Sequence, residues 1–212
     1  MEVFKGVEFN YVLMRARWLR ERKRDYYYRK AKREGYRSRA AYKLMQINEK
    51  HKIIKEGNVV IDLGAAPGGW SQVAKELVGA KGFVLGIDLK EIAPIKGVEF
   101  IKGDITQKEV IDNVLAFGRR ANVVIADLSP SMSGTYSIDH ARSVHLCECA
   151  LEFAEKILEP KGNFVTKIFQ GAMLNDYINK LRSKFETVKI YVPEAKHKRS
   201  SEVYLVAKGF KS

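Results

Sequence analysis

The feature that most constrains the fold is an alternation, from Val59 onward, of short apolar runs with segments of helical periodicity. The apolar runs lie at 59–61, 83–87, 98–101, 123–126 and 164–166, and helical patterns fit 70–79, 107–117, 139–158 and 172–184. Strands that alternate with helices predict a mostly parallel sheet, and near-continuous apolar strands suit a sheet that is covered on both faces. The chain is therefore expected to be an α/β protein, and 212 residues suffice for one such domain.

Both ends of the chain depart from this alternation. Residues 187–192 and 203–207 look like strands, but too few residues separate them for a parallel crossover, so we expect an antiparallel hairpin. Residues 1–50 are basic, contain no proline and favour helix. We therefore expect a basic helical N-terminal extension over 1–50 and the main domain over 51–212.

The positive charge is concentrated near the N-terminus. The net charge is +13, and residues 15–39 hold twelve basic residues against three acidic ones. A solvated helix face is one interpretation, but aromatic residues that suit base stacking are interleaved with the charge: Trp18, Tyr26, Tyr27, Tyr28 and Tyr36. The segment therefore predicts contact with nucleic acid, and the candidate RNA contacts are Arg29, Lys32, Arg33, Arg37, Arg39, Lys198 and Arg199.

Several classes of protein do not fit. The longest apolar runs are too short for a transmembrane helix, and the first residues lack the layout of a signal peptide, so no membrane partner is expected. Cys147 and Cys149 point to different sides of a predicted helix and should not pair, which favours a reducing, cytoplasmic location. No cluster of cysteine and histidine suggests a metal site, so no metal is expected.

Polar residues gather where the predicted strands end. Asp62, Asp88, Asp127 and Lys167 each follow an apolar run, and Glu202 begins the final strand. Carboxyl ends of parallel strands share one edge of a sheet, and an antiparallel strand begins at that edge. We therefore expect a ligand site along this rim.

The turn from 62 to 70, Asp-Leu-Gly-Ala-Ala-Pro-Gly-Gly-Trp, joins the first strand to a helix. It does not match the dinucleotide motif, because position 66 is alanine, and it lacks the phosphate-loop lysine, because position 70 is tryptophan. Asp88 is placed to bind a ribose diol and Asp104 an adenine amino group. The turn thus favours a nucleoside with an uncharged linker, and a merely tight turn is the alternative.

Three stretches, at 35–44, 62–70 and 127–130, resemble the FtsJ family of RNA 2′-O-methyltransferases. The resemblance extends from about residue 20 to 208 and implies an S-adenosylmethionine-dependent methyltransferase fold. That fold is Rossmann-like, with a seven-stranded, mostly parallel sheet and a C-terminal antiparallel hairpin. The candidate cofactor contacts are Gly64, Pro67, Gly68, Gly69, Trp70, Asp88, Leu89, Asp104, Ile105 and Asp127.

The resemblance also implies a catalytic tetrad of Lys43, Asp127, Lys167 and Glu202. Lys43 interrupts an apolar helical stripe. The alternative interpretation is a lysine at the edge of the core that extends its charged end to solvent. Lys167 lies in an apolar strand and needs a nearby carboxylate such as Asp127. Taken alone, Asp127 could cap the turn that follows it, and Glu202 would be an exposed strand start. In the implied mechanism Lys167 is the general base.

The chain is similar to the compact branch of the family, which implies methylation of a uridine in large-subunit ribosomal RNA by a cytoplasmic monomer. A transfer RNA or an mRNA cap is the alternative substrate of the same chemistry. A non-catalytic RNA-binding factor of ribosome assembly is the alternative of another class, and an intact tetrad argues against it. A nucleotide-dependent oxidoreductase does not fit the glycine pattern.

Overall fold

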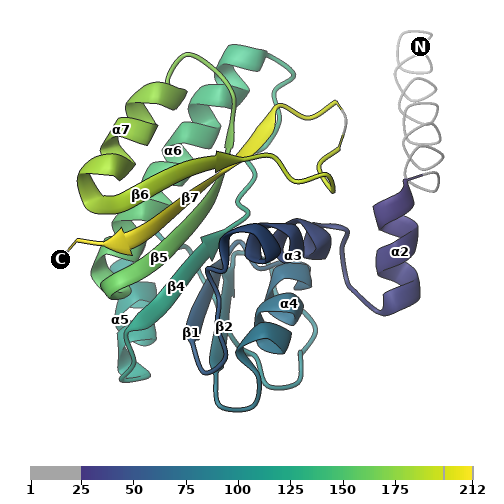
Figure 1. The fold of residues 1–212 in the computed structure, drawn as a ribbon, viewed down its shortest axis with the longest axis vertical. Helices are drawn as coiled ribbons and strands as arrows, with labels where there is room; N and C mark the ends of the chain where they lie inside the picture. The colour runs from purple at the N-terminus through teal and green to yellow at the C-terminus, as the bar shows by residue number, and fades with distance from the viewer. Residues whose placement is uncertain (1–24, 198, 212) are drawn as a thin grey trace, which may run out of the picture.

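The computed structural model describes residues 25–197 and 199–211. Two helices come first, α2 (Tyr26–Glu34) and α3 (Ala40–His51). The alternating part follows as β1 (Val59–Leu63), α4 (Gly69–Val78), β2 (Phe83–Asp88), β3 (Glu99–Lys102), α5 (Lys108–Ala116), β4 (Ala121–Ala126), α6 (Tyr136–Ile157), β5 (Leu158–Phe169) and α7 (Leu174–Lys184). The chain then forms β6 (Phe185–Tyr191) and β7 (Glu202–Phe210) (Figure 1).

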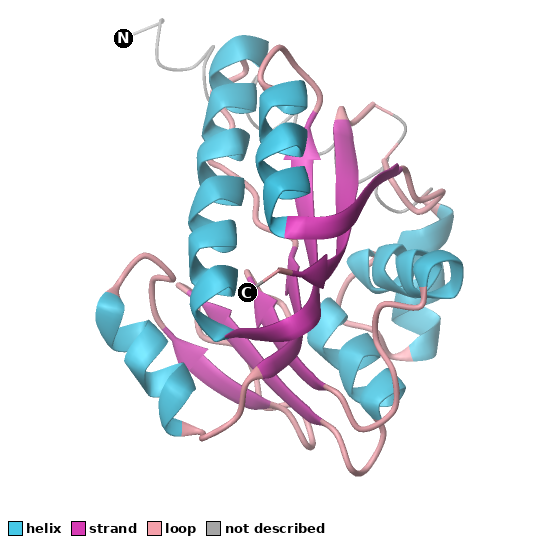
Figure 2. Ribbon diagram, turned by 60° about the vertical axis from the view of Figure 1, so that its left-hand side comes forward, coloured by secondary structure: helices cyan, strands magenta, loops and turns pink. Residues whose placement is uncertain are grey.

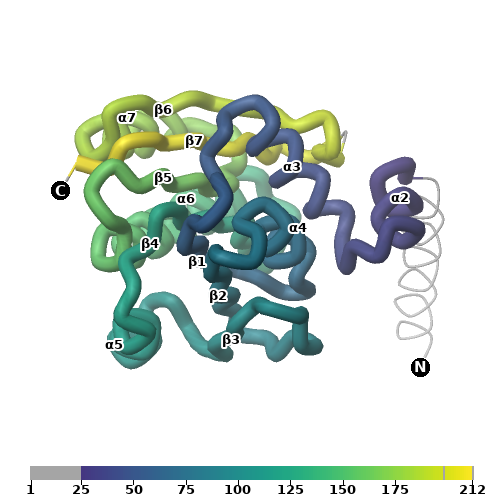
Figure 3. The backbone as a smooth tube through the Cα atoms, turned by 60° about the horizontal axis from the view of Figure 1, so that its bottom comes forward, coloured from purple at the N-terminus to yellow at the C-terminus, as the bar shows by residue number. Residues whose placement is uncertain are grey.

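The strands form one seven-stranded sheet in the order β3-β2-β1-β4-β5-β7-β6, which Figure 3 shows as a stack from β3 to β6. The pairs from β3 to β5 are parallel, whereas β7 is antiparallel to both β5 and β6. The predicted mostly parallel sheet and its C-terminal antiparallel hairpin are therefore confirmed.

Helices cover both faces of the sheet, as Figure 2 shows. On one face, α5, α6 and α7 pack on the strands through Val110, Val144, Leu151, Ile178 and Leu181. On the other face, α3 and α4 pack on the strands through Ala41, Leu44, Ile47, Val73 and Val78. Burial on both faces explains why the central strands β1, β2 and β4 are almost continuously apolar rather than alternating.

The face of the sheet that each residue occupies determines what reaches the rim. Val123 and Ile125 of β4, Val165 of β5 and Tyr204 of β7 all contribute to the core beneath α3 and α4. Side chains two residues apart on a strand share a face. Asp127, Lys167 and Glu202 continue these rows, so they reach the rim on the side that α3 covers.

Helix α3 belongs to the predicted extension by sequence but also contributes to the core. Its Ala41, Leu44 and Ile47 are fully buried. Helix α2 lies farther out, joined to α3 through Gly35, which adopts a left-handed conformation with φ of 81°. Trp18 and the basic residues before Asp25 lie outside the described residues.

Candidate active site

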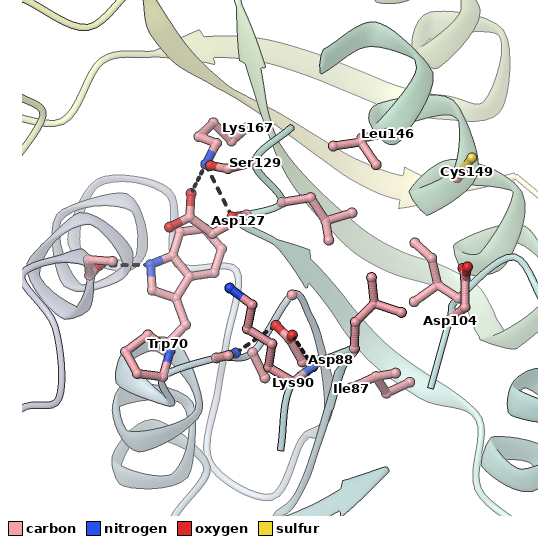
Figure 4. A pocket seen from close by; sticks show the side chains of 18 of the residues that line it. Trp70, Ile87, Asp88, Lys90, Asp104, Asp127, Ser129, Leu146, Cys149 and Lys167 are labelled. Atoms are coloured by element: carbon pink, nitrogen blue, oxygen red, sulfur yellow. Dashed lines mark hydrogen bonds and ion pairs between the residues drawn. The ribbon is translucent and has the colours of Figure 1, made fainter. Parts of the chain in front are cut away.

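A cavity of about 840 Å³ opens at the carboxyl ends of the parallel strands. Its wall is built from the glycine turn after β1, the segments after β2, β3 and β4, and the middle of α6 (Figure 4). All of the predicted cofactor contacts except Gly68 line this cavity. The residues of the predicted tetrad, Lys43, Asp127, Lys167 and Glu202, line it as well.

The glycine turn brings the backbone close to the cavity and to α3. A β-carbon on Gly64 would lie 2.7 Å from Leu128 Cδ2, and Gly64 has a φ of 76°, so a larger residue would be both crowded and strained there. Helix α4 begins at Gly69, directly after this turn. Trp70, 3% exposed, donates its indole N–H to the carbonyl oxygen of Ala40 at 2.7 Å and so fixes α4 against α3.

Two carboxylates line the cavity farther along the rim. Asp88 accepts hydrogen bonds from the backbone N–H of Ala66 at 2.9 Å and of Lys90 at 2.8 Å, which fix the orientation of its carboxylate. Asp104 accepts from the backbone N–H of Thr106 at 2.9 Å and from its hydroxyl at 2.8 Å. Both carboxylates are thus held in defined orientations by hydrogen bonds from the protein.

The four residues of the tetrad form two ion pairs at one end of the cavity. Lys167 Nζ lies 3.1 Å from Asp127 Oδ1, and Lys43 Nζ lies 2.7 Å from Glu202 Oε1. Lys167 also donates to the Asp127 carbonyl oxygen at 3.1 Å and to the Ser129 hydroxyl. The expected carboxylate partner of Lys167 is therefore present, and Lys43 is buried with a partner of its own.

Tyr204 joins the two ion pairs. Its hydroxyl donates to Asp127 Oδ1 at 2.8 Å, and Lys43 Nζ lies 5.6 Å from the centre of its ring. Tyr204 is opposite Lys167 in the sheet register and is fully buried. Sequence reasoning missed this residue, although its position two residues after Glu202, on the same face, was a usable signal. Ser129 was also missed as a contact, although it lies within the 127–130 stretch.

The surroundings of Asp127 favour its ionised form. Burial on its own raises the pKa of the carboxyl, but two cations and a hydroxyl outweigh burial and hold the pKa below its ordinary value. These groups are Lys167, Lys43 and the hydroxyl of Tyr204. The end of the cavity therefore carries a fixed negative charge between two lysines.

Asp62, beneath the glycine turn, has the opposite character. It is fully buried, and burial raises its pKa to about 7. The Ser71 hydroxyl donates to one of its oxygens at 2.6 Å. Asp62 does not line the cavity. Its hydrogen bond with Ser71 instead links the end of β1 to α4, on either side of the glycine turn.

The predicted RNA contacts fall into two groups. Arg29, Lys32 and Arg33 are exposed on α2, and Arg199 is exposed in the β6–β7 connection. Arg37 and Arg39 are instead directed at the protein. Arg39 forms an ion pair with Asp25 and donates to the Ala195 carbonyl oxygen at 2.5 Å, while Arg37 donates to three backbone carbonyls. Lys198 lies outside the described residues.

The tyrosines of α2 and of the turn that follows it also differ from one another. Tyr26 is 59% exposed, whereas Tyr27 and Tyr36 pack against Tyr42 with ring centres 5.4 and 5.7 Å apart. Tyr36 further donates its hydroxyl to Glu76 at 2.8 Å. Part of the aromatic character of this segment therefore serves to attach α2 to the domain.

The predicted separation of the two cysteines is confirmed, because Cys147 and Cys149 are not bonded to each other. Within residues 25–197 and 199–211, no three side chains of His, Cys, Asp or Glu are grouped as a metal site would require. In that same part of the chain, no helix has the length and apolar character needed to cross a membrane.

Comparison with known proteins agrees with this site. A family model described as FtsJ-like methyltransferase matches residues 36–210. A "Ribosomal RNA large subunit methyltransferase E" from Methanosarcina acetivorans is 57% identical over 190 residues, which are 89% of this chain and 69% of the relative. A protein of the same name from Marinobacter nauticus is 50% identical over 197 residues, covering 92% of this chain and 95% of the relative.

A solved structure is also similar. The crystal structure of a protein from Plasmodium falciparum, described as a ribosomal RNA methyltransferase, superposes with a TM-score of 0.76 at 29% identity and covers 82% of this chain and 98% of that one. The family model spans the glycine turn, all four residues of the tetrad and the C-terminal hairpin. The chain therefore belongs to the FtsJ-like methyltransferase family.

Proposed function

We propose that this S-adenosylmethionine-dependent methyltransferase modifies a ribose 2′-hydroxyl of large-subunit ribosomal RNA, at a uridine, and that Lys43, Asp127, Lys167 and Glu202 are its catalytic residues. The observation that carries the proposal is the Lys167–Asp127 pair, 3.1 Å apart at the end of the cavity. The relatives named above as large-subunit methyltransferases support the choice of RNA.

The cavity fits the cofactor chemically. Its volume of about 840 Å³ lies within the usual range for small-molecule sites. In this proposal Asp88 would accept hydrogen bonds from a ribose diol, and Asp104 from an adenine amino group. The glycine turn would let the backbone approach the ligand, and the ionised Asp127 would stabilise the positive charge of the sulfonium. The remaining predicted contacts, Gly64, Pro67, Gly68, Gly69, Trp70, Leu89 and Ile105, are proposed to enclose the ligand.

The tetrad would then activate the ribose. A ribose hydroxyl is a weak nucleophile until its proton is being removed, and Lys167 in its neutral form would accept that proton. Asp127 and Ser129 hold Lys167 Nζ in place, and Glu202 orients Lys43 beside them. S-adenosylmethionine supplies a methyl group that is already activated on a sulfonium sulfur. Positioning of the hydroxyl oxygen in line with that group is therefore the main task of the protein.

The exposed basic residues of α2 would supply RNA affinity. Arg29, Lys32 and Arg33 project from a helix joined by a short turn to α3, which carries Lys43. We propose that residues 1–50 contact RNA and that 51–212 form the catalytic domain, with α3 completing the core of that domain. We further propose that the protein acts as a cytoplasmic monomer, supported by its two unpaired cysteines and by a sheet covered on both faces by its own helices.

The test is methyl transfer from labelled S-adenosylmethionine to isolated large ribosomal subunits, naked large-subunit RNA and transfer RNA, followed by mapping of 2′-O-methyl sites. We expect one labelled uridine in large-subunit RNA, in the subunit or in naked form. Label in transfer RNA alone would identify the alternative substrate. Binding of large-subunit RNA without any methyl transfer would identify a non-catalytic assembly factor.

A further inference from the structure

Arg37 reaches from the turn between α2 and α3 to the segment 89–97, which connects β2 to β3. Its Nη1 donates to the Ala93 carbonyl oxygen at 2.6 Å and to the Pro67 carbonyl oxygen at 3.3 Å, and its Nη2 donates to the Pro94 carbonyl oxygen at 2.7 Å. One guanidinium thus bridges the glycine turn and the segment after β2. Both segments line the cofactor cavity, through Pro67 on one side and through Leu89 and Lys90 on the other.

The backbone of Arg37 is anchored as well. Its N–H donates to Gln72 Oε1 at 2.9 Å, and Gln72 Nε2 donates to the Gly35 carbonyl oxygen at 3.1 Å. Gln72 lies one turn into α4, the helix that begins at the glycine turn. The guanidinium is therefore held at a defined place relative to the cofactor site, rather than carried on a mobile chain.

The packing around Gly68 shows how closely these parts fit. A β-carbon at Gly68 would lie 2.7 Å from Ile95 Cδ1 and 3.1 Å from Arg37 Cδ. The glycine turn, the segment 89–97 and the stem of Arg37 therefore pack directly against one another.

We propose that Arg37 is a positioning residue for the cofactor. Its side chain holds the segment 89–97 against the glycine turn, and we call this set of contacts the latch. Lys90, the second residue of this segment, donates its N–H to the Asp88 carboxylate at 2.8 Å, so the placement of the segment affects the orientation of a predicted ribose contact. Leu89, which is 67% exposed, is carried by the same segment. The latch rests on the cofactor site and does not depend on which RNA is methylated.

This role differs from the RNA contact that the charge pattern predicts for Arg37. Three hydrogen bonds already direct its guanidinium, which has five N–H donors, at backbone carbonyls. Arg33 on α2 makes a suitable comparison because its side chain is 73% exposed. An RNA contact and a cofactor latch affect different ligands, so the two roles can be separated by measurement.

The test is calorimetric titration with S-adenosylhomocysteine, without RNA, of the wild type, Arg37→Ala, Arg37→Lys and Arg33→Ala. We expect Arg37→Ala to bind about tenfold more weakly, equivalent to about 1.4 kcal/mol. Arg37→Lys should be similarly weak, because a point charge cannot reproduce the planar fork that reaches three carbonyls. Arg33→Ala should bind the cofactor product normally and bind RNA more weakly.

Kinetics provides a second measurement that a general loss of structure would not reproduce. For Arg37→Lys, the KM for S-adenosylmethionine should rise, while the transfer rate at saturating cofactor and the KM for RNA stay near the wild-type values. Wild-type affinity of either Arg37 variant for S-adenosylhomocysteine, or a rise in the KM for RNA alone, would overturn the latch. Because the titration contains no RNA, such a failure would leave the proposed methylation of ribosomal RNA untouched.

Discussion

Variants of the ion pair between Lys43 and Glu202 can separate the effect of these residues on the stability of the protein from their effect on methyl transfer. Their charged atoms are 2.7 Å apart, and their side chains are only 10% and 9% exposed. Removing one member of such a pair leaves a buried charge without a partner, at a cost of about 3–5 kcal/mol. Lys43→Met should therefore lower the free energy of unfolding by about that amount, a large part of the stability of a typical domain.

Adding Glu202→Gln to Lys43→Met should recover most of the lost stability, because the unpaired charge disappears while the shape of the side chain is kept. The measurement is urea unfolding of the wild type, both single variants and the double variant, which gives the coupling energy between the two residues. Single-turnover methyl transfer with each protein separates the effect on function. We expect the double variant to be stable yet poorly active. A double variant no more stable than Lys43→Met would show that the loss of stability comes from packing and not from the unpaired carboxylate.

Three further predictions concern other parts of the site. In the cofactor-free protein, burial raises the pKa of Asp62 to about 7, so the free energy of unfolding should fall by about 4 kcal/mol as the pH rises from about 4 to 7. Urea unfolding of Asp62→Asn across pH 4–8 should lack this fall, and the same pH dependence of stability in the variant and the wild type would contradict the prediction. Tyr204→Phe removes the hydroxyl that donates to Asp127, so it should lower the free energy of unfolding by about 1.5–3 kcal/mol and slow single-turnover methyl transfer. Unchanged stability would show that the hydrogen bond between Tyr204 and Asp127 contributes nothing to folding. Replacing Arg29, Lys32 and Arg33 by Glu should weaken RNA binding and leave the affinity for S-adenosylhomocysteine unchanged. The slope of log affinity for RNA against log salt concentration should become shallower by roughly 0.7–0.9 for each lost phosphate contact. An unchanged slope would mean that these residues of α2 face solvent and do not contact RNA.

The sheet could be predicted because its signal is local. Apolar runs bounded by helical periodicity identify buried parallel strands, and the short separation of the last two strands implies their antiparallel pairing. Strand β5 is longer than the sequence predicts, since it begins at Leu158, directly after α6, and not at Phe164. The intervening Pro160, Lys161 and Gly162 look like a turn, and the strand accommodates them through a register shift opposite Ala121 and Val123 and a positive φ at Lys161.

Contacts within the site between residues far apart in the sequence were harder to predict. Tyr204 in an apolar strand looks like an ordinary core residue, because its hydroxyl partner, Asp127, is 77 positions away in the sequence. Arg37 and Arg33 look equivalent as members of one basic segment, yet Arg37 donates to backbone carbonyls and Arg33 is exposed. Which cations face solvent depends on where a distant segment, here 89–97, comes to lie, and charge density alone does not contain that information.

Single-turnover methyl transfer with saturating cofactor and RNA tests whether Lys167 removes the proton from the ribose hydroxyl. Lys167→Ala and Lys167→Arg should both bind S-adenosylmethionine and RNA nearly normally, yet lose about 10² to 10⁴ in the rate of transfer, the usual contribution of a general base. The arginine variant should fail as severely as alanine, because guanidinium keeps its protons in proteins and cannot accept another. A Lys167→Arg enzyme that transferred methyl groups at the wild-type rate would show that Lys167 is not the general base.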